Sequence, residues 1–287
     1  MRTRSTALTA LAAGLALVVL PVAVAAGPAA AGPAASGTSH GKAPMLSSPS
    51  ASTSPTPLLN KGGKVLRNSK TYAIYWGTPS AFPSDLVTGM AALLSGFSGS
   101  TYLATANQYV GGTATTTYVG ALSDTSAPPK SAPSTSALVS EVAKVLAAAG
   151  IAPDTNALYL VYTSNLPKVN YCAWHASGTI GATTVQVGYL PNMAGTTGCY
   201  PTSAPFASTT PYSYATRAQA DNTAHEFMEA VTDPVPPTGW VDKNGAEIGD
   251  KCNFVYLAPV TLTGTANVWQ IQAEWSNATN ACAQTTP

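Results

Sequence analysis

The chain has 287 residues, and its formal net charge is +1 because 13 basic side chains nearly balance 12 acidic ones. Only 9% of the residues are charged, and no basic patch is interleaved with aromatic residues, so nucleic acid is not an expected partner. Once an N-terminal leader is set aside, the remaining length suits one domain.

The N-terminus predicts export from the cell. The first four residues carry two arginines, and a long apolar run with small residues follows, which is typical of a secretory signal peptide at residues 1–26. Cleavage after Ala25, Ala26 or Ala31 fits the pattern. A membrane anchor is the alternative, since the run approaches spanning length. Its richness in Ala and Gly favours a cleaved signal, and we expect a secreted protein without a membrane span.

Residues 27–60 consist largely of Ala, Gly, Ser, Pro and Thr. Such a stretch cannot bury enough apolar surface to offset the entropy lost on ordering. We predict a disordered linker or pro-segment here, followed by one α/β domain at residues 61–287.

The apolar pattern of this domain predicts alternating strands and helices. Residues 157–164 form a continuous run of β-forming residues and indicate a central strand. Residues 183–190 alternate polar and apolar residues and indicate an exposed or edge strand. Other strands are expected at 70–77, 114–122 and within 268–276, and helices at 83–97, 135–151 and 212–234. This order predicts an α/β (α+β) layered domain with a mixed sheet.

Four cysteines behind a signal peptide predict two disulfides. Of the three pairings, we favour Cys172–Cys199 and Cys252–Cys282, because each closes a loop of moderate length. A zinc site built from all four cysteines is the alternative, but it lacks a close C-x-x-C spacing.

The segment NTAHEFMEAVTDP, residues 222–234, carries the candidate chemistry. His225 and Glu229 are four residues apart, so a helix places them on one face, where they can hold one metal ion. Glu226 stands where H-E-x-x-H zinc proteases have the general base that acts on water. A carboxylate replaces the second histidine of that motif, which zinc accepts but which makes the site harder and more negative.

A catalytic zinc ion is expected to have three protein ligands plus water, so a third ligand is needed. We favour His175 and Asp250 equally, because each lies close to a cysteine that a disulfide would fix in place. The candidates are His175, Asp233, Glu247 and Asp250.

Acidic residues gather around this motif, since 7 of the 12 in the chain fall within residues 221–250. A solvated helix face is the alternative explanation, but few basic side chains stand at helical spacing to relieve the repulsion. Residues 242–250, DKNGAEIGD, offer a second alternative, a calcium loop. Their spacing does not match an EF-hand, and a hairpin turn at Asn244 and Gly245 is favoured.

Several of these segments resemble a known family. AHEFMEAVTDP, GWVDKNGAEIGDKC and WQIQAEWSNATNAC are similar to the bacterial and fungal relatives of the phosphate-induced protein 1/EXORDIUM family, in which an H-E-x-x-E-x-x-T-[DN]-P helix precedes E-I-G-D-x-C. YAIYWG and YCAWHASG resemble its early strand and its histidine segment. The likeness spans residues 66–282 and is strongest over 222–252.

The resemblance implies secretion and a zincin-like domain. In the general zincin layout, an edge strand runs antiparallel beside the metal-bearing helix and holds the substrate by strand pairing, and residues 183–190 are the expected edge strand.

These observations lead to three hypotheses. The first is a secreted zinc-dependent hydrolase, above all a metallopeptidase, in which Glu226 activates water against a peptide or cell-wall substrate. The second is a noncatalytic extracellular protein with a structural metal site or a cell-wall-binding role. The third is a plain disulfide-stapled domain whose acidic helix is a solvated face. Zinc is the expected cation, and calcium is the minor alternative.

Overall fold

The computed structural model describes residues 41–44, 55–196, 198–201, 210–264 and 267–285 of the chain. The predicted signal peptide at residues 1–26 lies outside the described residues. Two parts of the predicted linker at 27–60 are described as strands, β1 (Gly41–Pro44) and β2 (Leu59–Asn60). Leu58 is only 1% exposed, so the domain begins slightly before residue 61.

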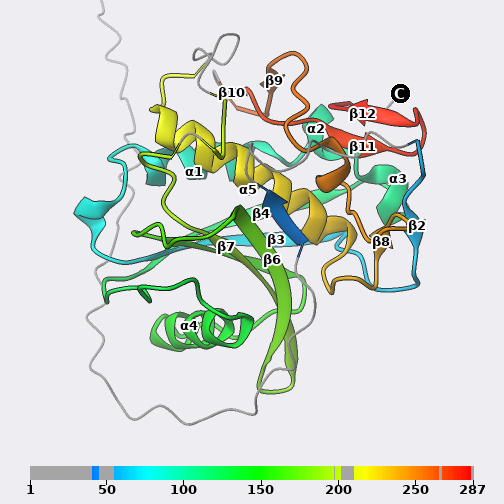
Figure 1. The fold of residues 1–287 in the computed structure, drawn as a ribbon. Helices are drawn as coiled ribbons and strands as arrows, with labels where there is room; N and C mark the ends of the chain where they lie inside the picture. Colours follow the sequence, from blue (N-terminus) through cyan, green and yellow to red (C-terminus); the bar gives the residue numbers. More distant parts are fainter. Residues whose placement is uncertain (1–40, 45–54, 197, 202–209, 265–266, 286–287) are drawn as a thin grey trace, which may run out of the picture.

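A six-stranded mixed sheet carries the fold, with the order β1–β6–β7–β5–β3–β4 (Figure 1). Strands β7, β5, β3 and β4 are parallel, whereas β6 is antiparallel to both of its neighbours, β7 and β1. The five longer strands are β3 (Asn68–Trp76), β4 (Thr115–Asp124), β5 (Ala157–Thr163), β6 (Tyr171–Ile180) and β7 (Thr183–Leu190). The predicted mixed α/β class is thus confirmed.

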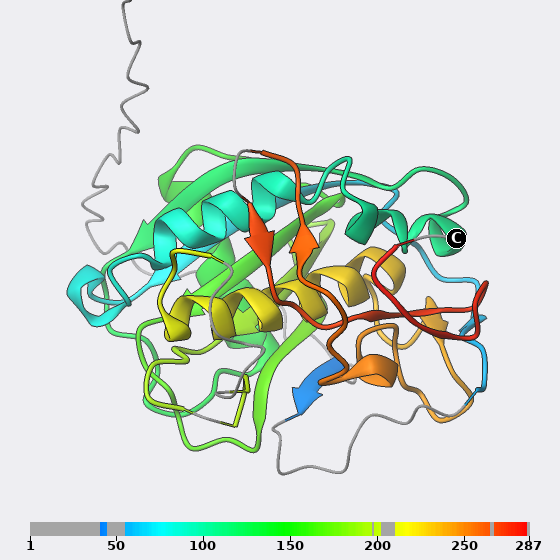
Figure 2. The ribbon, with the colours of Figure 1, turned by 90° about the horizontal axis from the view of Figure 1, so that it is seen from above.

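Helices cover both faces of this sheet. α4 (Thr135–Ala148) lies under one face, while α1 (Leu86–Gly96) and α5 (Tyr214–Thr232) lie side by side across the other (Figures 1 and 2). Two short helices, α2 (Thr101–Ala104) and α3 (Asn107–Val110), follow α1. All three predicted helices are confirmed as α1, α4 and α5, with ends displaced by a few residues.

Strand β5 shows why the sheet needs cover on both sides. All seven of its residues are buried. Leu158, Leu160 and Tyr162 belong to the core shared with α1 and α5, whereas the alternate residues Tyr159 and Val161 belong to the core shared with α4. Side chains alternate across a strand, so a continuous apolar run is what a strand covered on both faces requires. The predicted central strand is confirmed.

The predicted strand at residues 183–190 is confirmed with the same bounds, but its predicted place at an edge of the sheet is wrong. These residues form β7, which lies between β6 and β5 and is buried from Val185 to Leu190. The polar alternation is misleading because β6, which was not predicted as a strand, forms an antiparallel hairpin with β7 and covers its edge. The edge strand beside α5 is β1, which pairs with β6.

The C-terminal part consists of short strand pairs and two disulfides. Cys172–Cys199 and Cys252–Cys282 both form, which confirms the favoured pairing and excludes a zinc site of four free cysteines. The strand pairs are β2 with β8 (Trp240–Val241), β9 (Val260–Thr261) with β10 (Val268–Trp269), and β11 (Glu274–Ser276) with β12 (Ala281–Ala283). Two single 3-10 turns complete the chain, η1 (Pro79–Ala81) and η2 (Asp250–Cys252). Within the described ranges, no helix is both long and apolar enough to cross a membrane.

A buried carboxyl group on α4 makes the stability of the fold depend on pH. Glu141 is 5% exposed and lies beside Lys144, which also pairs with Asp124 at the end of β4. Burial, together with Asp124, raises the pKa of Glu141 from 4.5 to about 7. The folded chain therefore holds this proton more tightly than the unfolded chain, and stability is lost as pH rises between those two values.

The variant Glu141→Gln should remove this loss. Relative to the unaltered chain, the variant should gain about 1–2 kcal/mol of unfolding free energy between about pH 5 and about pH 8. This is less than the full linkage value, because solvent screens electrostatic interactions near the protein surface. Urea unfolding at a series of pH values measures the difference. Parallel pH profiles for the two proteins would contradict it.

Candidate metal centre

Helix α5 carries three residues of the candidate site, His225, Glu226 and Glu229. Ser213 is the N-cap of this helix, and its Oγ accepts a hydrogen bond from the backbone N–H of Thr216 at 3.3 Å. Nearly all residues of the helix are buried. Phe227 packs into the core shared with α1, where its ring stacks on that of Phe97 at 4.6 Å. The helix ends at Thr232, directly before Asp233 and Pro234, because a proline cannot continue a helix.

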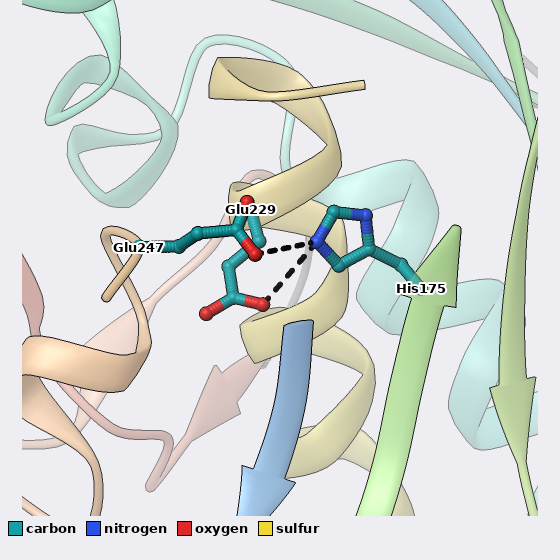
Figure 3. Close-up of side chains that lie close together, drawn as sticks. All are labelled: His175, Glu229 and Glu247. Atoms are coloured by element: carbon teal, nitrogen blue, oxygen red, sulfur yellow. Dashed lines mark hydrogen bonds and ion pairs between the residues drawn. The ribbon is translucent and has the colours of Figure 1, made fainter. Parts of the chain in front are cut away.

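Two histidines approach Glu229 from different sides. His225 Nε2 lies 3.1 Å from Glu229 Oε1, one helical turn away on α5. His175 Nε2, on β6, lies 3.4 Å from the other oxygen, Glu229 Oε2, and 3.1 Å from Glu247 Oε2 (Figure 3). Asp250 Oδ1 lies 3.9 Å from His225 Nε2. Glu229 therefore stands at the middle of the cluster.

Strand β6 places His175 on the α5 face of the sheet. Its neighbours Trp174 and Ala176 belong to the core on the α4 face, so the period of two turns His175 toward α5, where it is fully buried. The disulfide of Cys172 with Cys199 joins β6 to the segment before α5, and Asn222 on α5 donates a hydrogen bond to the Cys199 carbonyl at 3.0 Å. The strand and the helix are thus tied together near the site.

The loop that carries Glu247 and Asp250 is held equally firmly. The backbone N–H of Asp250 donates to Glu229 Oε1 at 3.1 Å, and Gln272 Nε2 donates to the carbonyl of Gly249 at 3.2 Å. The disulfide of Cys252 follows directly. A Cβ atom at Gly249 would lie 2.9 Å from His225 Nδ1 and 3.1 Å from Glu229 Oε1, so only glycine lets the loop come this close.

The structure brings together all four predicted ligands, His175, His225, Glu229 and Asp250, and adds Glu247. The sequence offers His175 and Asp250 as alternatives, whereas both lie at the site, because Glu229 presents its two oxygens in two directions. Glu247 was a candidate that the sequence did not favour. Glu247 lies three residues before Asp250, with Gly249 between them, and this proximity to Asp250 is the sequence feature that could have identified it.

Two other sequence hypotheses have a simpler local explanation. Asp233 Oδ1 accepts a hydrogen bond from the backbone N–H of Gly239 at 2.8 Å. This bond ties the end of α5 to the following loop and does not involve the ligand cluster. Asp242 Oδ1 accepts the backbone N–H groups of Asn244 and Ala246 at 2.7 and 3.0 Å, so the predicted turn forms. Glu247 points to His175 instead of into this turn, and calcium binding there stays a prediction.

The charges of the cluster are strongly coupled. Burial alone would lower the pKa of His175 and His225, but the adjacent carboxylates raise both pKa values well above the ordinary one. Burial opposes ionisation of Glu229, yet the two imidazoles lower its pKa to about 2. Burial raises the pKa of Asp250 to about 7 and that of Glu247 well above its usual range. The protonation state of each group in the cluster therefore depends on the charges of its neighbours.

Glu226 is fully buried beside this cluster, next to His225 on α5. Burial raises its pKa to about 8, and its carboxylate interacts electrostatically with those of Glu229 and Asp250. A carboxyl group whose pKa lies near neutrality is suited to accept and return a proton. Its role as a general base stays a prediction.

Buried polar atoms without a hydrogen-bond partner indicate what the cluster fits. His225 Nε2 lies near Glu229 without the alignment of a hydrogen bond. The unpartnered atoms here are His175 Nδ1, His225 Nδ1 and Nε2, Glu229 Oε2 and Glu247 Oε1. Such atoms are uncommon in folded proteins. Imidazole nitrogen and carboxylate oxygen are ligands of zinc and related divalent cations, so the residues present fit a bound cation.

Comparison of the chain with protein-family models, with curated proteins and with solved structures finds no match. The family resemblance and the zincin-like layout therefore stay predictions, and the function must be inferred from the geometry of the site.

The close approach at Gly249 gives a test of the site that leaves every ligand in place. We expect Gly249→Ala to weaken zinc binding about tenfold or more, because the added methyl group displaces His225 or Glu229. Zinc competition titration measures the affinity. Gly178→Ala is the matched control, because its Cβ would lie 2.6 Å from Val139 Cγ2 on the opposite face of the sheet. Equal zinc affinity in the two variants would contradict the prediction.

Proposed function

We propose that the protein is a secreted metal-dependent hydrolase that cleaves peptides. The observation that carries the proposal is the convergence of two imidazoles and three carboxylates, from β6, α5 and the loop at residues 247–250, with buried ligand atoms that lack partners. This is the donor set of a divalent cation rather than of a solvated acidic face.

Each group has a role in the proposed reaction. His175, His225 and Glu229, with Glu247 and Asp250, hold the cation. Zinc, when bound, supplies a Lewis acid that polarises a carbonyl group and activates water. Glu226 accepts the proton of the attacking water and returns it to the leaving amine. Zinc is favoured over calcium because calcium takes oxygen ligands, whereas this site includes two imidazoles.

The position of the site beside a sheet edge supports a peptide as the substrate. Strand β6 carries His175 and pairs antiparallel with β1, in a register that places Gly41 opposite His175. Figure 3 shows β1 passing in front of α5 beside the ligand cluster. An extended peptide that paired with β6 in the same way would run past the metal ligands. Asp250, whose side chain is 24% exposed, marks the side that solvent reaches.

Two disulfides support the proposed location outside the cell. Cys172–Cys199 and Cys252–Cys282 form in this structure, and disulfides persist in oxidising compartments. The signal-like sequence at residues 1–26 points the same way.

A noncatalytic extracellular protein with a structural metal is the second candidate. The side chains of His175, His225, Glu229 and Glu247 are at most 3% exposed, and closed coordination is typical of structural zinc. This candidate expects metal removal to unfold the protein and no hydrolysis to be lost.

The substitution Glu226→Gln separates the two candidates. We expect it to leave the metal content unchanged and to lower kcat for peptide hydrolysis by about 10²- to 10⁴-fold, because the proton acceptor is lost. Elemental analysis and a peptide-library assay measure both quantities. Glu141→Gln is the matched control. Glu141 is also buried, but it lies on α4, on the opposite face of the sheet from the site. A purified protein without bound metal would sink the proposal.

Strand β1 occupies the edge of β6 at which a substrate peptide would pair, so we expect β1 to hinder substrate binding. Replacing both Lys42 and Ala43 by proline removes two backbone N–H groups and should break this pairing. We expect kcat/KM for a peptide to rise about tenfold as the edge of β6 becomes available. The control, Lys42→Ala with Ala43→Ser, keeps both N–H groups and should leave kcat/KM unchanged. Equal rates for the two double variants would count against peptide binding at this edge.

A further inference from the structure

We infer that the centre holds two divalent cations bridged by the carboxylate of Glu229. The inference rests on the proposed function, because it concerns the same site, and it changes the number of ions and the role of Glu229. It is carried by the positions of the ligand atoms and not by the number of acidic residues.

The ligands fall into two groups of three that share one member. His175, Glu229 and Glu247 form one group, and His225, Glu229 and Asp250 form the other. Within each group, one ligand atom from each residue lies within 4.8 Å of the others. Among the described residues, no larger group satisfies this distance, so Glu247 does not join His225 and Asp250 does not join His175.

A single ion does not account for both groups. Two ligand atoms on one zinc ion are at most about 4.4 Å apart, twice the metal–oxygen distance. The ligand atoms of each group of three lie within 4.8 Å of one another, close to this limit, whereas those of the five described residues together do not meet even the 4.8 Å distance. Each group offers one imidazole and two carboxylates, which suits zinc or manganese.

Glu229 has the geometry of a bridge. Its Oε1 faces His225 Nε2 at 3.1 Å and its Oε2 faces His175 Nε2 at 3.4 Å. A carboxylate that gives one oxygen to each of two ions is typical of two-metal hydrolytic sites, where the ions lie roughly 3.5–4 Å apart.

Unpartnered atoms point into both halves of the cluster. Glu229 is fully buried, and its Oε2, on the His175 side, has no hydrogen-bond partner. His225 is 1% exposed, and its Nε2, on the Asp250 side, has none either. Each group therefore has a buried ligand atom that a cation would satisfy, independent of the acidic character of the site.

Charge balance favours two ions as well. Four carboxylates stand together here, those of Glu226, Glu229, Glu247 and Asp250. Metal ligands bind in their deprotonated form, so metal binding would leave these carboxylates ionised. One divalent cation would then offset two of the four negative charges and two cations would offset all four, which matters in a buried site because isolated charges are costly there.

The stoichiometry of the full chain tests the inference. Protein stripped of metal by a chelator is titrated with zinc in a calorimeter, and the loaded protein is analysed for zinc. We expect two equivalents. His175→Ala and His225→Ala each remove a ligand from one group only and should retain about one equivalent, while the distant variant Glu141→Gln should retain two. One equivalent in the folded unaltered chain would overturn the inference.

A second measurement covers the case in which a histidine variant does not fold. The unaltered chain loaded with manganese should give the exchange-coupled electron paramagnetic resonance signal of a carboxylate-bridged pair. A spectrum of isolated manganese ions alone at saturation would overturn the inference. Peptide hydrolysis with one bound ion would leave the proposed function intact and refute the bridge. Two bound ions without hydrolysis would support the bridge and refute the proposed function.

Discussion

The carboxylate of Glu229, buried between two imidazoles, is the interaction on which the site depends. A charged group taken out of water must be compensated nearby, because the desolvation penalty is several kcal/mol per ion. His225 lies one turn from Glu229 on the same helix, so the helical period alone places it beside the carboxylate. His175 lies on β6, so only the packing of β6 against α5 brings it to Glu229. The depth of α5, the register of β6 and the close approach at Gly249 all serve to bring these partners within reach.

The sequence predicts the parts of this arrangement that are local. The four-residue spacing of His225 and Glu229 fixes their common face, because any helix has that period. The continuous apolar run of β5 indicates a buried strand for the same kind of reason. The pairing of the cysteines was also predicted, since loop length limits the choice.

Long-range features were not predictable in the same way. The segment of β6 mixes small, polar and aromatic residues, so it has no clean alternation, and its strand is defined by backbone pairing on both sides. The sequence does not indicate β6 and therefore predicts β7 at an edge, although Gln186 of β7 is fully buried. The ligand set was incomplete for a related reason. Spacing along the chain does not show that Glu247 and Asp250 reach opposite sides of Glu229.

The low-complexity segment before the domain shows a limit of composition as a guide. Residues 27–60 have little apolar surface to bury, which argues against a packed core there. Pairing at a sheet edge needs only backbone N–H and C=O groups, which every residue except proline provides in full. Gly41, Lys42 and Ala43 provide both groups, so β1 can form without a large apolar side chain.

Assembly of the ligand cluster depends on whether the two disulfides have formed. One covalent bond lies three residues from His175, and the other lies two residues from Asp250. Each bond limits how far its ligand can move away from α5, and reduction removes both limits at once. A newly made chain in a reducing compartment has neither tie. The cluster around Glu229 is thus assembled together with the oxidised fold.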